Sequence, residues 1–214
     1  MEIRYIYHSA YEILTEKYQL VFDYYKGKLD LCTDRKKIFF VSHSHHDHYA
    51  PSVHQMADVV VLWDGIMHRD EKTVALGVGE EAVLDDLVIR TSGSTDEGLS
   101  FDIELDGRRL IFAGDLNDWN WPDDTPEEER EMHEAFLQHL ARFKPEPDVL
   151  FFPIDYRIED NYDKGVNEAV RQLRPQYLFP MHFTAHPEIL PVFRDKIAGK
   201  VRFVMPEESP FTLV

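Results

Sequence analysis

The stretch Ile38-Phe39-Phe40-Val41-Ser42-His43-Ser44-His45-His46-Asp47-His48 joins a continuous apolar run to a loop with four histidines and one aspartate. Four apolar residues in succession are typical of a buried strand, and the histidines follow almost directly. Imidazole and carboxylate groups are the common protein ligands of divalent transition metals. The stretch therefore predicts a strand that ends in a metal-binding loop.

The spacing within this loop indicates how its side chains divide between metal ions. His43 and His45 are two positions apart, and in an extended or turning segment such side chains point the same way. Both imidazoles can therefore bind one metal ion. Asp47 and His48 lie further round the turn and can face a second ion.

Two further ligand candidates follow apolar strands later in the chain. Asp115 comes directly after Ile111-Phe112-Ala113-Gly114, and His182 comes directly after Leu178-Phe179-Pro180-Met181. A side chain at the carboxyl end of a strand is well placed to enter a cleft, and the Asp115 carboxylate can bridge two metal ions. Each residue alone is commonplace, but their positions relative to the histidine loop favour a shared metal site.

Composition narrows the class of protein. The chain has 214 residues and a formal net charge of −17, which disfavours binding to a phosphate backbone. The single cysteine, Cys32, leaves no internal disulfide and fits a reducing compartment. No apolar run is long enough to cross a bilayer, and the N-terminal residues lack the layout of a signal peptide. We expect a cytoplasmic protein with a small-molecule substrate and no nucleic-acid or membrane partner; the sequence leaves the oligomeric state open.

The hydrophobic pattern predicts a strand-rich first half followed by alternating helices and strands. Asp106-Gly107 is a hairpin turn signal, and Thr125-Pro126-Glu127-Glu128 is a capping box that opens a helix. Strands are expected over 3–7, 11–14, 18–22, 38–41, 59–63, 82–84, 87–90, 99–105, 109–112, 149–153, 176–180 and 201–204, and helices over 125–143, 166–173 and 187–198. This order favours one α/β domain over residues 1–214, with at least two sheets.

The combination resembles the metallo-β-lactamase superfamily of metal-dependent hydrolases over nearly the whole chain. The resemblance rests on the N-terminal strand pair followed by Asp23, the H-x-H-x-D-H loop, the Gly114-Asp115 pair after a strand, and the final strand that ends in His182. The segment from Val149 to His182 is similar to the branch that contains L-ascorbate-6-phosphate lactonase-like proteins. The resemblance implies an αββα sandwich of two mixed β-sheets with helices on the outer faces.

The family pattern also implies a set of metal ligands. It assigns the first metal ion to His43 and His45 and the second to Asp47, His48 and His182, with Asp115 bridging. One or two divalent ions are expected, with zinc preferred. The family usually supplies a third histidine to the first ion, and Ser94 stands at that position here.

Three readings of this departure stay open. The site holds two ions, the first more weakly; or it holds one ion at Asp47, His48, Asp115 and His182; or Asp96 serves as a substitute oxygen ligand. The last arrangement would favour a harder metal such as manganese or iron.

The expected reaction is attack by a metal-activated water on a small ester, lactone, thioester or phosphoester. Asp47 is the predicted catalytic residue, because it would both bind metal and orient the water. His8, Tyr156, Arg157 and Trp119 are predicted to contact the substrate: Arg157 as a clamp for an anionic group, Tyr156 as an oxyanion donor and Trp119 as a wall of the site. Two alternatives remain, a non-catalytic metal- or ligand-binding relative and a nuclease of the same fold.

Overall fold

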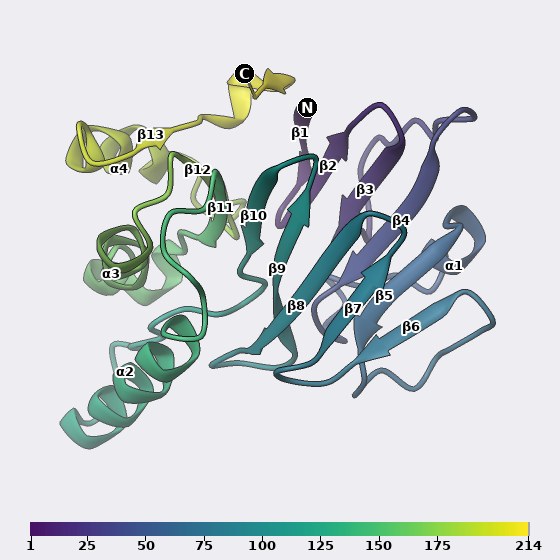
Figure 1. The fold of residues 1–214 in the computed structure, drawn as a ribbon. Coiled ribbons are helices and arrows are strands. Elements are labelled where there is room, and N and C mark those ends of the chain that lie inside the picture. The colour runs from purple at the N-terminus through teal and green to yellow at the C-terminus, as the bar shows by residue number, and fades with distance from the viewer. Residues whose placement is uncertain (214) are drawn as a thin grey trace. The chain divides into compact units, whose positions relative to one another are not determined.

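The computed structural model describes residues 1–213, which fall into two units. Unit 1 contains Met1–Gly77 and the chain from Pro206 onward, and unit 2 contains Val78–Met205. Each unit is built on its own seven-stranded sheet (Figure 1). Both sheets mix parallel and antiparallel pairs, so the expected α/β fold with two mixed sheets is confirmed. That residues 1–214 act as a single domain stays a prediction.

The sheet of unit 1 has the order β14-β1-β2-β3-β4-β5-β6. The strands from β1 to β3 pair antiparallel, and those from β3 to β6 pair parallel. Its strands are β1 (Glu2–Tyr7), β2 (Ala10–Leu14), β3 (Tyr18–Phe22), β4 (Lys36–Val41), β5 (Val59–Trp63), β6 (Thr73–Leu76) and β14 (Phe211–Thr212). The short helix α1 (Val53–Met56) connects β4 to β5, and its Val53 packs in a buried cluster with Phe39 and Val60.

The sheet of unit 2 has the order β13-β12-β11-β10-β9-β8-β7. Here β7 to β10 pair antiparallel, and β10 to β13 pair parallel. Its strands are β7 (Glu81–Leu84), β8 (Leu87–Gly93), β9 (Leu99–Leu105), β10 (Arg108–Phe112), β11 (Val149–Pro153), β12 (Tyr177–Met181) and β13 (Arg202–Phe203). Three helices fill the crossovers after β10, β11 and β12: α2 (Pro126–Leu140), α3 (Lys164–Leu173) and α4 (Ile189–Ile197).

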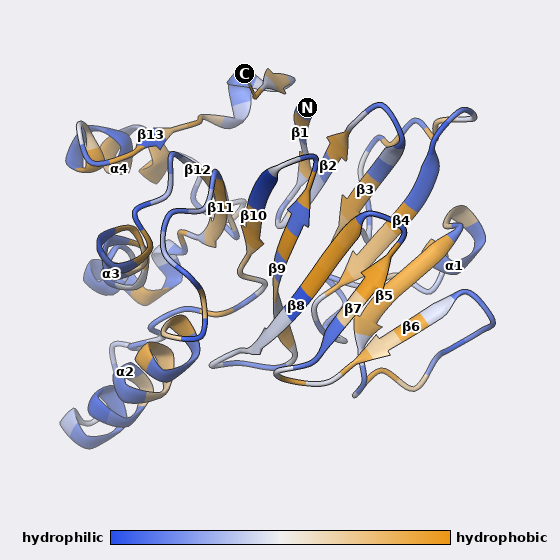
Figure 2. Cartoon of the chain, viewed as in Figure 1, coloured by the Kyte–Doolittle hydropathy of each residue, from blue (hydrophilic) through white to orange (hydrophobic). Residues whose placement is uncertain are grey.

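Apolar side chains determine which face of each helix is buried. In α2 the fully buried Phe136 meets Phe152 of β11 with ring centroids 6.2 Å apart, whereas the exposed face is mostly hydrophilic (Figure 2). Thr125 caps α2 through the predicted capping box with Glu128. The helix therefore begins where the sequence predicted, and its apolar stripe attaches it to the sheet.

The sequence patterns predicted all strands except β6 and β14 and all helices except the four-residue α1 and two 3₁₀ turns. β6 is a half-exposed edge strand and β14 has two residues, so neither carries a periodic apolar signal. The turn between β9 and β10 has positive φ at both Asp106 (53°) and Gly107 (71°). This is the backbone that an Asp-Gly hairpin requires. No helix within residues 1–213 is long and apolar enough to cross a membrane.

Candidate metal centre

The histidine loop of unit 1 follows β4, a central strand that pairs in parallel with β3 and β5. His43 and His48 are fully buried, whereas His45 and His46 are exposed. The backbone N–H groups of His48 and Tyr49 both donate to the carbonyl of His45 at 3.0 Å, which reverses the chain after His45. This turn brings the rings of His43, His45 and His48 together: the centroid of His43 lies 4.6 Å from that of His45 and 4.1 Å from that of His48.

Asp23, which follows β3, holds this loop in place. Because β3 and β4 are parallel neighbours, the residues after them meet at one edge of the sheet. The fully buried Asp23 carboxylate accepts hydrogen bonds from the backbone N–H of Ser42 at 2.8 Å and from its hydroxyl at 2.6 Å. Oδ2 of Asp23 also lies 2.7 Å from Nδ1 of His48.

These contacts fix which ring nitrogens are available to a metal. Nδ1 of His48 donates to Asp23, and Nδ1 of His43 lies 2.8 Å from the Ser42 hydroxyl. In both rings Nε2 is therefore the nitrogen for a metal ion. A carboxylate behind a histidine fixes the ring and raises its basicity, as in many metal sites. Sequence reasoning noted Asp23 only as the residue after a strand and missed this role.

His8 lies next to Asp47. Nε2 of His8 lies 3.4 Å from Oδ2 of Asp47, and the ligand atoms of His8, Asp47 and His48 all lie within 4.8 Å of one another. The hydrogen bond from His8 and the nearby charge of His48 together hold the pKa of Asp47 well below its usual range, although partial burial opposes them. Asp47 is therefore an anion at neutral pH, as a metal ligand must be.

In unit 2, three side chains converge at one edge of the sheet because they follow three parallel neighbours. Asp115 comes after β10, Asp155 after β11 and His182 after β12. All three are buried. Two of the turns need a left-handed backbone: φ is 56° at Gly114, directly before Asp115, and 63° at His182 itself. Positive φ costs a non-glycine residue free energy and is often found where function fixes the geometry.

His182 lies between the two carboxylates. Its Nδ1 is 2.7 Å from Oδ2 of Asp155, and its Nε2 is 3.4 Å from Oδ2 of Asp115. Burial alone would lower the pKa of His182, but the charges of Asp115 and Asp155 outweigh it and raise the pKa to about 10. Burial likewise opposes ionisation of Asp155, yet hydrogen bonds from His182 and Arg157 lower its pKa to about 2. The negative charge around this imidazole attracts a cation, either a proton or a metal ion.

The loop that contains Ser94, where the family usually has its third histidine, forms a turn held by hydrogen bonds. The Ser94 hydroxyl accepts the backbone N–H of Asp96 at 3.2 Å, and carboxylate oxygens of Asp96 and Asp115 lie within 4.8 Å of each other. The Thr95 hydroxyl donates to the carbonyl of Asn117 and accepts its N–H, the latter at 3.1 Å. Ser94 therefore acts as a turn residue, while Thr95 ties this loop to the segment that carries Asp115.

Arg157 and Trp119 lie next to His182, and Trp121 contacts both of them. Arg157 donates to Asp155 through its backbone N–H at 2.9 Å and Nε at 2.8 Å, and its guanidinium carbon lies 5.9 Å from the ring centroid of Trp121. The ring of Trp119 stacks on that of Trp121 with centroids 6.0 Å apart, and it forms a T-shaped contact with His182 with centroids 5.8 Å apart. Trp119 is 6% exposed and Trp121 40%, so Trp121 is the tryptophan that a ligand can touch.

Tyr156 contacts other aromatic rings. It is 38% exposed, and its ring centroid lies 5.5 Å from that of His186 and 5.6 Å from that of Tyr162. It begins the 3₁₀ turn Tyr156–Asn161, one residue after Asp155. Its position in the chain fits the predicted substrate contact, which stays a prediction.

The comparisons with known proteins agree on one protein family. A family model described as a beta-lactamase superfamily domain matches residues 2–182. The UPF0173 metal-dependent hydrolase STH3160 of Symbiobacterium thermophilum is 26% identical, over 89% of this chain and 87% of that protein.

Two solved structures share the fold. One is Igni18, a metallo hydrolase from the archaeon Ignicoccus hospitalis, with a TM-score of 0.69, 20% identity and coverage of 100% of this chain and 97% of that chain. The other is the metallo-beta-lactamase fold protein YhfI from Bacillus subtilis, with a TM-score of 0.64, 13% identity and coverage of 95% of each chain. At these identities the likeness concerns the fold.

Proposed function

Because the chain belongs to the metallo-β-lactamase superfamily, we propose that it is a metal-dependent hydrolase that directs a metal-activated water at a small ester, lactone, thioester or phosphoester. One observation carries the proposal. In each unit a buried histidine donates Nδ1–H to a buried aspartate at 2.7 Å, His48 to Asp23 and His182 to Asp155. This carboxylate–histidine pairing prepares Nε2 to bind a metal ion.

The proposed ligands follow the family pattern. They are His43 and His45 for a first ion, Asp47, His48 and His182 for a second, and Asp115 as the bridge. The donor set fits a divalent metal, because it offers imidazole nitrogens and ionised carboxylates and contains no thiolate. Zinc is the expected metal for such a set.

Asp96 is the proposed substitute for the missing histidine. Two observations support it over Ser94: the Asp96 carboxylate lies within 4.8 Å of that of Asp115, and the Ser94 hydroxyl is occupied in the turn. A carboxylate in place of an imidazole makes the first site richer in oxygen, which brings manganese or iron into range beside zinc.

The catalytic roles follow from charge and position. When bound, a divalent ion lowers the pKa of a water ligand to about 7 and polarises the substrate oxygen. Asp47, kept ionised beside His8, orients the attacking water. Arg157, whose side chain is 48% exposed, is placed to hold an anionic group of the substrate, and Trp121 offers a flat apolar surface beside it.

Elemental analysis and a substrate panel test the proposal. Protein purified without added metal should contain at least one divalent ion per chain, and lactone, thioester and phosphodiester substrates should identify a turnover that Asp47→Ala abolishes. Asp34→Ala, a change at an exposed aspartate, is the control and should leave turnover unchanged. Protein that binds no metal even after zinc or manganese is supplied would refute the proposal. Metal without any turnover would favour the non-catalytic relative, and turnover confined to nucleic acids would favour the nuclease.

The role of Asp96 has its own measurement. Asp96→Ala should lower the number of metal ions bound or weaken the weaker ion by about tenfold or more. Asp123→Ala, at an exposed aspartate of the same unit, should not. If manganese occupies the wild-type site, its electron paramagnetic resonance spectrum should also change in Asp96→Ala. Unchanged stoichiometry and affinity would exclude Asp96 as a ligand.

A further inference from the structure

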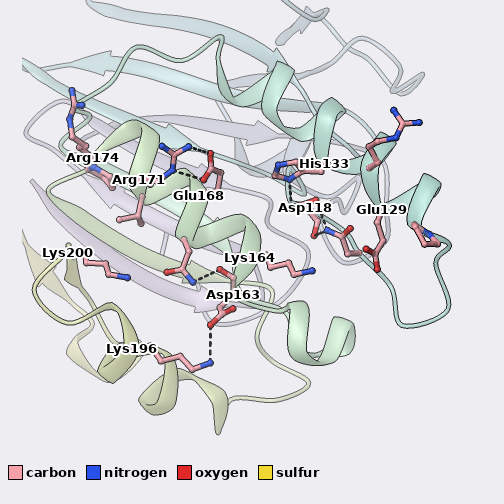
Figure 3. A pocket seen from close by; sticks show the side chains of 16 residues that line it. Asp118, Glu129, His133, Asp163, Lys164, Glu168, Arg171, Arg174, Lys196 and Lys200 are labelled. Atoms are coloured by element: carbon pink, nitrogen blue, oxygen red, sulfur yellow. Dashed lines mark hydrogen bonds and ion pairs between the residues drawn. The ribbon is translucent and has the colours of Figure 1, made fainter.

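The helices of unit 2 surround a cleft that neither Asp115 nor His182 lines. Its volume is about 1210 Å³, and its walls come from α2, α3, the end of α4 and the segments beside them (Figure 3). We propose that this cleft binds a small molecule that carries two or more phosphate groups. Ligand sites typically measure roughly 300–1,000 Å³, so the space suffices for such a molecule.

The charge of the cleft is opposite in sign to that of the chain. The whole chain has 23 lysines and arginines against 40 aspartates and glutamates. The cleft reverses this ratio, with six basic residues against four acidic ones: Arg130, Lys164, Arg171, Arg174, Lys196 and Lys200 against Asp118, Glu129, Asp163 and Glu168. A concave surface concentrates the field of its charges, so an anion is attracted here although the protein as a whole repels it.

Some of these cations are already paired, but only weakly. Arg171 donates to Glu168 through Nε at 2.8 Å, and Lys196 lies 3.0 Å from Asp163. The side chains of Arg171 and Lys196 are 71% and 51% exposed, and such surface pairs contribute little because water and salt screen them. Within residues 1–213, Lys164 and Lys200 form no ion pair, so their charges are available to a ligand.

Helix stabilisation does not explain Lys164. It is the first residue of α3, whose first turn contains no acidic residue and whose N-cap Asp163 makes no side-chain cap. A cation at this end is opposed by the helix dipole, whereas Lys196 in the last turn of α4 is favoured by it. The charge of Lys164 adds to the positive end of α3, and both favour an anion in the cleft.

His133, whose ring is held by a hydrogen bond, also lines the cleft. Nδ1 of His133, on α2, lies 2.8 Å from Oδ2 of the buried Asp118. The other carboxylate oxygen of Asp118 accepts the Asn120 amide at 2.7 Å. Because these contacts hold the imidazole in one orientation, it gives a ligand a polar contact that costs little entropy to order.

The size and charge of the chain favour a small ligand over a polymer. A net charge of −17 repels a nucleic-acid backbone along its length, whereas a compact anion meets mainly the nearby cations because salt screens charges beyond about 10 Å. The two unpaired lysines come from different elements, α3 and the turn after α4 (Figure 3). A ligand with at least two charged groups can use both.

Calorimetric titration of the full chain with inorganic pyrophosphate tests the proposal. The protein is first freed of metal with a chelator, so that no metal ion recruits pyrophosphate to the metal centre and failure of the hydrolase proposal does not affect the result. Lys164→Gln/Lys200→Gln should weaken binding by about tenfold or more. The control Lys28→Gln/Lys144→Gln removes the same charge at exposed lysines outside the cleft and should bind like the wild type.

Three results would overturn the proposal. These are no binding of pyrophosphate to the wild type, no weakening in Lys164→Gln/Lys200→Gln, or equal weakening in the control pair. A short single-stranded oligonucleotide that binds the cleft more tightly than pyrophosphate would also overturn it. Parallel titrations with adenosine triphosphate and inorganic triphosphate identify the ligand further: tighter binding of the nucleotide supports a nucleoside phosphate, and equal binding supports recognition of the phosphate chain alone.

Discussion

His182 donates from Nδ1 to Oδ2 of Asp155 at 2.7 Å, although 27 positions separate the two residues in the chain. His182 directly follows β12, and Asp155 is the second residue after β11. The two strands are parallel neighbours. The sheet therefore brings them together. Asp23 and His48 form the same pair in unit 1 at 2.7 Å, 25 positions apart. Each pair fixes the orientation of one imidazole ring.

Asp155→Asn should weaken metal binding by about 10–100-fold, because the ring of His182 loses the carboxylate that fixes its orientation and raises its basicity. Competition with a chromophoric chelator measures the affinity. Asp160→Asn, at an exposed aspartate of the following turn, is the control and should bind metal normally. Equal affinity in Asp155→Asn and wild type would contradict the role assigned to Asp155.

Asp23→Asn should lower the free energy of unfolding of the metal-free protein by about 1–3 kcal/mol. The carboxylate accepts the Ser42 backbone N–H at Oδ1 and both the Ser42 hydroxyl and Nδ1–H of His48 at Oδ2. The new amide has only one acceptor oxygen, so its NH2 group faces a donor on one side and buried polar groups lose partners. Urea unfolding measures the change. Asp30→Asn, where the side chain is 79% exposed, should have almost no effect. Wild-type stability in Asp23→Asn would show that this buried network is not stabilising.

The metal-free protein should lose stability as the pH rises from about 6.5 to about 10. The pKa of His182 is raised from 6.5 to about 10 in the folded state, so the folded chain binds this proton more tightly than the unfolded chain. The stabilisation from this proton is complete below pH 6.5 and is lost as the pH rises through the pKa of His182 in the folded state. Chemical unfolding at several pH values measures it. His182→Gln should flatten the profile in this range, whereas His46→Gln, at an exposed ring, should not.

Arg157→Gln should raise KM by about tenfold for substrates that carry a carboxylate or phosphate group and leave KM for neutral esters nearly unchanged. The guanidinium is held by Asp155 and partly exposed, so its loss removes a charge that a ligand can reach. Steady-state kinetics with matched anionic and neutral substrates measure the difference. Arg194→Gln, at an exposed arginine of α4, is the control. An equal rise of KM for both substrate types would exclude recognition of an anionic group.

Most of the fold could be predicted because its signals are local. Continuous apolar runs such as Val149–Pro153 identify buried strands, and the capping box at Thr125 identifies the start of α2. The strands that were missed carry no such signal. β6 is half-exposed at the sheet edge, and β14 has only two residues, which pair with β1 from the far end of the chain.

The candidate site, like the fold, has parts that local sequence patterns predict and parts that they do not. The sequence by itself determined which residues are proposed as ligands, because His43, His45, Asp47 and His48 stand in one short loop and Asp115 and His182 each follow an apolar strand. Only the tertiary structure decided which residues support them. Asp23 and Asp155 become partners of His48 and His182 because neighbouring parallel strands end at the same edge of a sheet. Strand order is set by packing and hydrogen bonds between distant segments, and no local pattern of residues records it.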